Sequence, residues 1–340
     1  MAKKRRNSLR GLLLIVVLGV VAVLGALWLA GKSCVKSECE LYIPTGSSYE
    51  ALLDSLESAG VERLSVVDLL GKLKRLDRNP KAGHYVLRSG ATPMAVVNML
   101  RSGAQKPVRL TFNNTRTLAD LAGRIAQSIE ADSLALLEHF NAPATAQKYN
   151  LKPEELIGLF IPNTYEVWWN ISPEALTDRM AREWERFWNA DRTAKLARTK
   201  LSKMEVITLA SIVYEETKNV GEMSKIAGVY INRLRRGMPL QACPTAKYAL
   251  GDFSIKRVLY KHTQVPSPYN TYLHRGLTPG PICTPSIAAI DAVLDYADHK
   301  YIYFCAKEDF SGRHNFATTL KEHNRHAKRY AEALRKAKIR

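Results

Sequence analysis

The 340-residue chain contains few cysteines, and the five that are present form no recognisable metal-binding pattern. No CxxC pair and no Cys/His cluster with zinc spacing occurs, so we expect neither a metal nor a cofactor. In an exported protein Cys34 and Cys39 could pair, as could Cys243 and Cys283; alternatively, the cysteines are a few small buried thiols. The sequence leaves both possibilities open.

The sequence also lacks internal repeats, low-complexity tracts and an excess of glycine or proline (19 Gly and 15 Pro). Apolar residues make up 46% of it, which excludes a disordered or collagen-like polymer and predicts a folded core. Acidic residues are scarce relative to basic ones, 32 against 50, which gives a net charge of +18. An anionic partner is therefore expected, and nucleic acid, an acidic membrane surface or an anionic polysaccharide would each fit.

The N-terminus predicts a membrane anchor. Residues 1–10 include five Lys or Arg residues, and residues 11–30 are almost uninterruptedly apolar. About 20 such residues at 1.5 Å each span a hydrocarbon core of roughly 30 Å, and the basic cluster places the short N-terminus in the cytoplasm. The alternatives are a cleaved signal peptide or a buried helix. With the remaining chain outside the cytoplasm, a nucleic-acid partner is excluded.

Residues 31–39 resemble a linker, and residues 40–105 have the pattern of a small α/β module. Strand-like and helix-like segments alternate in it, each ended by turn residues. The expected elements are a strand at 41–43, a helix ended by Gly60, a helix near 66–76, a strand at 84–87 and a helix ended by Gly103.

Residues 106–340 are predicted to form a larger, mostly helical domain with a few short strands, which makes the whole chain α+β. A strand is expected at 108–112, followed by a helix capped by Thr117. Residues 156–169 suggest an extended segment and a turn, because Pro162 interrupts an aromatic run. The helical pattern that begins at Ser172 is broken by a region rich in Pro, Gly and Tyr at 239–285.

The clearest local signal lies in residues 202–217. Ser202 and Glu205 have the spacing of a capping box, which fixes the start of a helix. Val206, Leu209, Val213 and Glu216 then follow at steps of three and four, so Glu216 extends the apolar stripe. Glu215 is about 100° further round the helix and is expected to be more solvated. Adjacent glutamates thus receive different environments.

A carboxyl group held against apolar surface has a raised pKa, because its charged form loses hydration. Glu216 could then hold a proton near neutral pH, which a general acid for glycosidic bond cleavage requires. The alternative is a stripe that simply reaches solvent, with Glu216 paired to a basic residue.

A second feature is a loop in which Tyr269, Asn270 and Tyr272 lie among prolines and glycines. Aromatic rings beside amide and hydroxyl groups suit sugars, which have apolar faces and a rim of hydroxyls. Packed tyrosines in ordinary Pro/Gly turns are the alternative.

Five ordered motifs resemble those of the endolytic murein transglycosylases of the MltG/YceG-like family. They read LIGLFIPNTY, LASIVYEET, VYINRLRRGMPLQACPT, SPYNTYLHRGLTPGPICTPS and YIYFCAKEDFSGRHNF. The resemblance implies a transmembrane helix (11–30), a LysM-like subdomain (40–105) and a YceG-like catalytic domain (106–340). The family's catalytic glutamate lies in a motif similar to ASIVEKET, which maps it onto Glu216. The chain departs from the family at Tyr214, in place of a glutamate, and at Cys243, where Asp is more common.

The resemblance implies a lyase that cleaves the β-1,4 bond between N-acetylmuramic acid and N-acetylglucosamine and leaves a 1,6-anhydro end. A single carboxyl group suffices, whereas ordinary glycosidases need two. The sequence offers no compelling second carboxylate, because Glu205 belongs to the helix cap and Asp252 to a turn. Six residues are candidates for holding the glycan and stabilising developing charge, each with a structural role as the alternative. They are Asn232, Gln241, Tyr269, Asn270, Tyr272 and His314.

The resemblance further implies a single-pass protein of the inner (cytoplasmic) membrane whose catalytic domain is extracytoplasmic. Its expected partners are peptidoglycan glycan strands, the membrane and membrane-bound peptidoglycan synthases, and its expected task is to terminate nascent glycan strands. A non-catalytic, peptidoglycan-binding scaffold is the alternative.

Overall fold

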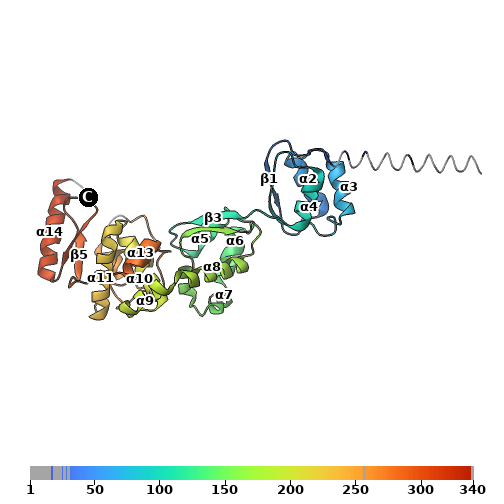
Figure 1. The fold of residues 1–340 in the computed structure, drawn as a ribbon. Helices are drawn as coiled ribbons and strands as arrows, with labels where there is room; N and C mark the ends of the chain where they lie inside the picture. Colours follow the sequence, from blue (N-terminus) through green and yellow to red (C-terminus); the bar gives the residue numbers. More distant parts are fainter. Residues whose placement is uncertain (1–16, 18–24, 26–27, 29–30, 256–257, 338–340) are drawn as a thin grey trace, which may run out of the picture. The chain divides into compact units, whose positions relative to one another are not determined.

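The computed structural model describes residues 31–255 and 258–337, together with the single positions 17, 25 and 28. It is a mixed α+β fold, mostly helical with a few short strands, as predicted (Figure 1). Within the described residues no helix combines the length and the apolar character needed to cross a bilayer. The basic segment 1–10 lies outside the described residues, and so does the predicted membrane helix 11–30 apart from three isolated positions.

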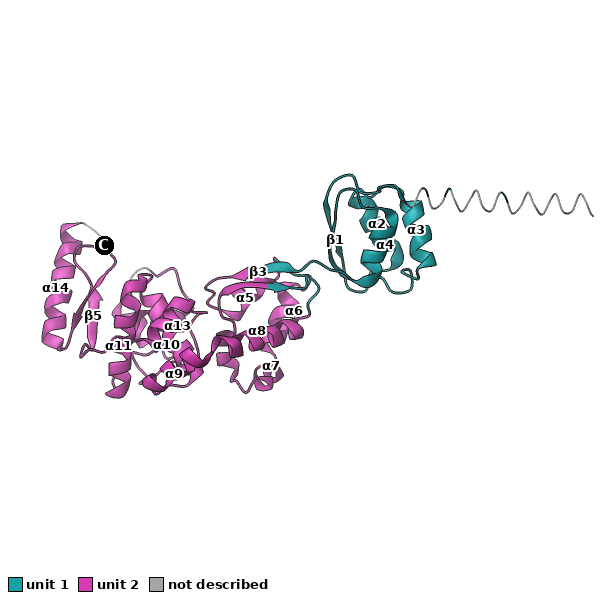
Figure 2. Ribbon diagram, viewed as in Figure 1, with its two compact units in different colours: residues 1–110, 128–130, 166–171 teal, residues 111–127, 131–165, 172–340 magenta. Residues whose placement is uncertain are grey.

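The chain divides into two compact units (Figure 2). Unit 1 consists of Met1–Leu110, Ser128–Glu130 and Glu166–Ile171, and unit 2 of Thr111–Gln127, Ala131–Tyr165 and Ser172–Arg340.

Unit 1 is built on one antiparallel strand pair covered by helices. Leu41 in the first strand is opposite Tyr85 in the second, and both side chains are buried. Gly103 ends the last helix in a left-handed conformation (φ 72°), which glycine adopts without strain. The elements are β1 (Cys39–Ile43), α2 (Tyr49–Ser58), α3 (Leu64–Leu73), β2 (Gly83–Leu87) and α4 (Pro93–Ser102). The strands and helices expected here are confirmed.

A second strand pair consists of β3 (Val108–Phe112) and β4 (Asn163–Val167). The strand at 108–112 and the Thr117 cap are confirmed, since the Thr117 hydroxyl accepts from the Asp120 N–H. Between these strands lie α5 (Leu118–Ile125), α6 (Ser133–Asn141), α7 (Pro143–Lys148) and a 3₁₀ helix, η1 (Pro153–Leu159). The prediction of extended chain from residue 156 is wrong for its first four residues. Pro153 and the Glu155 carboxylate, which accepts from the Lys152 N–H, start that helix instead.

The core of unit 2 surrounds α10 (Lys203–Glu216), which packs against α11 (Val220–Arg235), α12 (Cys243–Leu250) and α13 (Ile287–Leu294). Every α10 residue from Val206 to Val213 is buried. The predicted stripe residues Val206, Leu209 and Val213 are buried, and so are the residues between them, because α10 packs against several neighbouring helices. Two further helices, α8 (Pro173–Phe187) and α9 (Ala190–Thr199), precede it.

The chain ends in a small layer formed by β5 (Tyr303–Ala306), β6 (His314–Ala317) and α14 (Leu320–Lys336). The two strands are antiparallel, with Phe304 opposite Phe316. A short 3₁₀ helix, η2 (Tyr260–Gln264), lies in the Pro/Gly/Tyr-rich region. The five cysteines all lie in the described part and are free thiols, so neither suggested disulfide is formed.

Candidate active site

The first and last residues of α10 are both set by local backbone contacts. The Ser202 N–H donates to the Glu205 carboxylate (2.7 Å) and the Glu205 N–H to the Ser202 hydroxyl (3.2 Å), which confirms the predicted capping box. The helix stops where Thr217 adopts an extended conformation (φ −145°, ψ 140°). Glu215 and Glu216 consequently occupy its last turn.

The Glu216 carboxyl group is held by a buried tyrosine. Tyr230 of α11, only 1% exposed, donates its hydroxyl to Glu216 Oε1 at 2.6 Å. Burial raises the pKa of Glu216 from 4.5 to about 7, although the Tyr230 hydrogen bond and the positive charge of Lys247 oppose this rise. The pKa of Tyr230 is also raised by burial, so its hydroxyl keeps its proton. Glu216 can therefore gain or lose a proton near neutral pH.

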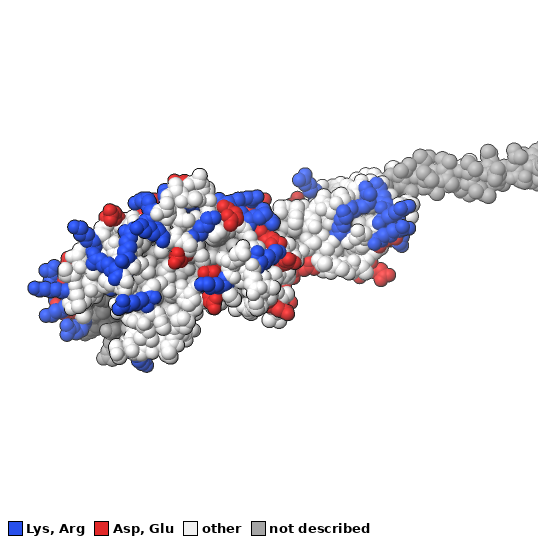
Figure 3. Space-filling model, turned by 90° about the horizontal axis from the view of Figure 1, so that it is seen from below, with Lys and Arg blue, Asp and Glu red and all other residues white. Residues whose placement is uncertain are grey.

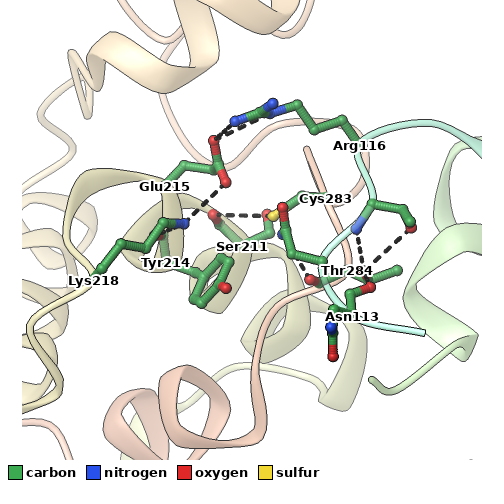
Figure 4. A network of polar contacts seen from close by, with 10 residues as sticks. Asn113, Arg116, Ser211, Tyr214, Glu215, Lys218, Cys283 and Thr284 are labelled. Atoms are coloured by element: carbon green, nitrogen blue, oxygen red, sulfur yellow. Dashed lines mark hydrogen bonds and ion pairs between the residues drawn. The ribbon is translucent and has the colours of Figure 1, made fainter. Parts of the chain in front are cut away.

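Glu215 is in a different environment from Glu216, as predicted, and that environment contains two cations. Arg116 donates from Nη2 (2.7 Å) and Nε (3.2 Å) to Glu215 Oε2, and Lys218 Nζ lies 3.2 Å from Oε1 (Figure 4). The Glu215 side chain is only 12% exposed. Cations, rather than water alone, therefore surround this carboxylate.

A set of hydrogen bonds attaches the loop that carries Arg116 to the segment that follows Cys283. Thr284 is central to it: its hydroxyl accepts from the Thr115 N–H (2.9 Å) and donates to the Asn113 carbonyl (3.2 Å) (Figure 4). The Cys283 thiol in turn donates to the Ser211 carbonyl of α10 at 3.6 Å. Arg116 is thereby held beside the end of α10.

Glu216 opens onto a cavity of about 240 Å³. One wall comes from α12, where Cys243 and Lys247 lie four residues apart and so share a helix face. The lining residues are Arg116, Glu215, Glu216, Cys243, Pro244, Lys247, Tyr248, Phe253 and Ile282. Two neighbouring hollows share residues with it, one through Arg116 and one through Tyr248. Among the described residues, no three His, Cys, Asp or Glu side chains gather to hold a metal ion.

A carboxyl group with a raised pKa at the wall of a polar cavity agrees with the resemblance in the motifs, and comparison with known proteins decides the family. The model of the YceG-like family matches residues 41–329. The chain belongs to the YceG-like family.

Two similar proteins support this assignment and share the name endolytic murein transglycosylase. The Bacillus subtilis (strain 168) protein is 29% identical over 333 residues, which cover 91% of each chain. The Streptococcus pneumoniae (serotype 2, strain D39) protein is 27% identical over 83% of this chain and 56% of its own. A crystal structure of a YceG-like protein from Listeria monocytogenes aligns with a TM-score of 0.57 and 29% identity, over 85% of this chain and 99% of that one.

Two of the predicted substrate residues of this YceG-like chain lie close to the cavity. The Tyr272 hydroxyl is 3.3 Å from Cys243 Sγ, which lines the cavity. The Tyr269 ring packs on Tyr248 with ring centroids 4.7 Å apart, and the two rings line the same neighbouring hollow. Both tyrosines are partly buried.

The two predicted asparagines are occupied inside the chain. Asn270 has no exposed surface, and its amide nitrogen donates to the carbonyls of Thr263 and Val265. Asn232 Nδ2 donates to the carbonyls of His299 (2.7 Å) and Tyr301 (3.0 Å). These contacts favour structural roles: Asn270 shapes the aromatic loop, and Asn232 attaches the segment before β5 to α11.

The remaining two candidates lie outside the residues that line the Glu216 cavity. Gln241 is exposed and has a left-handed backbone (φ 49°), with its N–H donating to the Thr271 carbonyl. His314 on β6 lies with Nδ1 3.1 Å from Glu222 Oε2, and its own N–H donates to Glu222 Oε1. His314 is thus paired with an acid at the start of α11.

The structure adds three residues that sequence reasoning missed, namely Tyr230, Arg116 and Lys247. Tyr230 reads as one more apolar position of α11, and its contact with Glu216 joins two helices. Arg116 is 99 residues from Glu215 in sequence, so no local pattern reveals the pair. Lys247 could have been noticed, because the i, i+4 spacing puts it on the same face as Cys243.

Proposed function

We propose that this chain is a peptidoglycan lytic transglycosylase, a lyase, in which Glu216 is the only acid–base residue. The name shared by its relatives supports this activity. The observation that carries the proposal is the Glu216 carboxyl group, held at a cavity wall by Tyr230 with its pKa raised to about 7. Such a group is protonated often enough at neutral pH to act as an acid and loses its proton easily enough to act next as a base.

The chemistry balances with one carboxyl group. Glu216 gives its proton to the oxygen that links muramyl C1 to the next sugar, and the C1–O bond breaks. The muramyl C6 hydroxyl oxygen then bonds to C1, and its proton returns to Glu216. Because the Tyr230 hydroxyl donates to Oε1, we assign both proton transfers to Oε2. Water is not consumed, and the product ends in a 1,6-anhydro sugar.

Glu215 is the obvious rival as a second carboxylate, since it lines the same cavity. A retaining hydrolase would need it as a nucleophile. Both of its oxygens, however, are bound to cations, Oε2 to Arg116 and Oε1 to Lys218. This arrangement supports a structural role for Glu215 and favours the reaction without water.

We further propose the finer parts of this function. The substrate is a nascent glycan strand cut at its MurNAc–GlcNAc bond, and the cut terminates elongation. The basic segment 1–10 and apolar run 11–30 support a single-pass anchor in the cytoplasmic membrane with the enzyme outside. Residues 40–105 act as a LysM-like glycan-binding subdomain, and membrane peptidoglycan synthases are the expected partners.

The test is the action of wild type, Glu216→Gln and Glu138→Gln on purified sacculi. We expect Glu216→Gln to lose roughly 10²- to 10⁴-fold in the rate of anhydro-end formation, as loss of a general acid does. Glu138→Gln is the matched control, because Glu138 is exposed on α6 and lines none of the cavities. Mass spectrometry of muropeptides gives the readout. Equal activity of wild type and Glu216→Gln would overturn the proposal, and no product from any variant would favour the scaffold.

A further inference from the structure

Two cationic side chains, Arg116 and Lys247, line the cavity beside Glu216, and they differ in whether an acidic side chain pairs with them. Arg116 is already bound: two of its nitrogens contact Glu215, and its guanidinium lies 4.8 Å from the centre of the Phe253 ring. Lys247 has neither a carboxylate within ion-pair distance nor a side-chain hydrogen bond among the described residues, though it lines the same cavity. When Glu216 is protonated, Lys247 is the charge in this cavity that no acid balances.

A free ammonium group at this position opposes the chemistry unless it has a further use. Its charge lowers the pKa of Glu216, whereas an acid that works at neutral pH needs that pKa raised. Cys243, one turn earlier on the same face of α12, shows that an uncharged side chain fits this wall. A lysine at position 247 is therefore best explained if the substrate brings an anionic group that pairs with it.

Peptidoglycan offers such an anion close to the bond that breaks. The sugar rings carry neutral N-acetyl groups, but the muramyl ring whose C1 must lie at Glu216 bears a lactyl group on C3. That group ends in a free carboxylate or continues into a stem peptide that carries carboxylates. The free lactyl carboxylate is attached to the same ring as the reacting carbon, and the carboxylates of a stem peptide lie further along the peptide.

We propose that Lys247 forms a carboxylate-binding subsite that recognises the lactyl or stem-peptide acid of the muramyl residue being cleaved. The inference rests on the proposed function and identifies the carboxylate of the substrate that the site recognises. In the partly enclosed cavity an ammonium–carboxylate hydrogen bond adds affinity and holds the muramyl ring with its C1 facing Glu216. Chitin-like strands, which lack the acid, would be poor ligands.

The experiment pairs a change in the protein with a change in the substrate. Wild type, Lys247→Gln and Lys247→Arg act on three glycans: one with stem peptides, one freed of peptides by an amidase, and one whose carboxylates have been converted to methylamides. Lys300→Gln is the matched control, since Lys300 is an exposed lysine of the same unit that lines none of the cavities. Anhydro ends are counted by mass, and thermal unfolding confirms that each variant folds.

We expect Lys247→Gln to lower kcat/KM about tenfold on carboxylate-bearing glycan, mainly through KM, as loss of one charge-assisted hydrogen bond does. Lys247→Arg should recover most of this loss. On the methylamide glycan the ratio of wild type to Lys247→Gln should fall below about two. A larger ratio on the peptide-free glycan identifies the lactyl group, and a larger ratio on the peptide-bearing glycan identifies the stem peptide.

The inference is overturned if Lys247→Gln and Lys300→Gln behave alike, or if the loss in Lys247→Gln is the same on charged and methylamide glycan. Failure of the proposed function looks different: wild type itself would then leave no anhydro ends on peptide-bearing glycan.

Discussion

Glu216 and Tyr230 mark the limit of what the sequence predicts about single residues. Helical spacing and the family motif both select Glu216, because its position follows from local geometry. Tyr230 lies 14 residues further on and meets Glu216 only because α10 and α11 pack together. No local sequence pattern indicates that the Tyr230 hydroxyl binds Glu216, so only the structure identifies the residue that positions the acid.

Replacing Tyr230 by phenylalanine tests this positioning. Loss of the hydroxyl removes a hydrogen bond that favours the ionised carboxyl, so the pKa of Glu216 should rise further. The alkaline limb of kcat/KM, expected near pH 7 in wild type, should move to higher pH. We also expect kcat to fall about 3- to 30-fold with KM little changed, because the carboxyl group is held less firmly.

The control for this change is Tyr301→Phe, whose hydroxyl makes no hydrogen bond among the described residues. An unchanged pH profile in Tyr230→Phe would show that the hydroxyl does not act on Glu216.

The stability of the fold should depend on pH through Glu216. The unfolded chain loses this proton near pH 4.5 and the folded chain near pH 7, so between these values the folded state binds more protons. Wild type is therefore expected to lose about 1–3 kcal/mol of unfolding free energy as the pH rises through this window. Glu216→Gln removes the titration and should show a smaller decline.

Urea unfolding of wild type and Glu216→Gln at pH 5 and pH 8 measures this difference. Parallel declines in the two proteins would mean that the carboxyl group titrates as it does in solution.

At the scale of elements, predictions based on helix caps and glycine ends are confirmed, whereas features that depend on neighbouring elements are not predicted. The capping box of α10 and the glycine end of α4 are fixed by backbone geometry within a few residues. The burial of the other faces of α10 is not predicted, because it depends on packing against α11, α12 and α13, and apolar residues do not reveal their partners. The start of η1 was missed because a short 3₁₀ helix has no periodic pattern of its own.

The Arg116–Glu215 pair joins two segments that are far apart in the sequence and that both line the cavity. In Glu215→Gln, Arg116 loses its charged partner, and we expect a loss of about 1–2 kcal/mol in unfolding free energy, because the pair is partly exposed. Activity should fall about 5- to 50-fold while the products remain anhydro ends. Urea unfolding and muropeptide analysis give the two readouts.

The contrary result would be a loss of activity in Glu215→Gln as deep as that in Glu216→Gln. It would assign Glu215 a direct part in the reaction.

At the scale of the molecule, composition predicts a folded core, and the excess of basic residues favours an anionic partner. Figure 3 shows Lys and Arg side chains over both units, with Asp and Glu among them and many basic side chains at the end where α14 lies. A net charge of +18 favours the approach of an anionic polymer, but it does not distinguish one anionic polymer from another. The residues that line the Glu216 cavity come from segments of unit 2 that are far apart in the sequence, so no local pattern predicts this cavity.

The central claim is that one acid cuts the glycan and the sugar's own hydroxyl replaces water. It is tested most directly by digesting purified glycan with wild type in water enriched in ¹⁸O and weighing the new ends. We predict anhydro ends that carry no ¹⁸O, because no atom of the solvent enters the product. Reducing ends that contain one ¹⁸O would show hydrolysis and contradict the account.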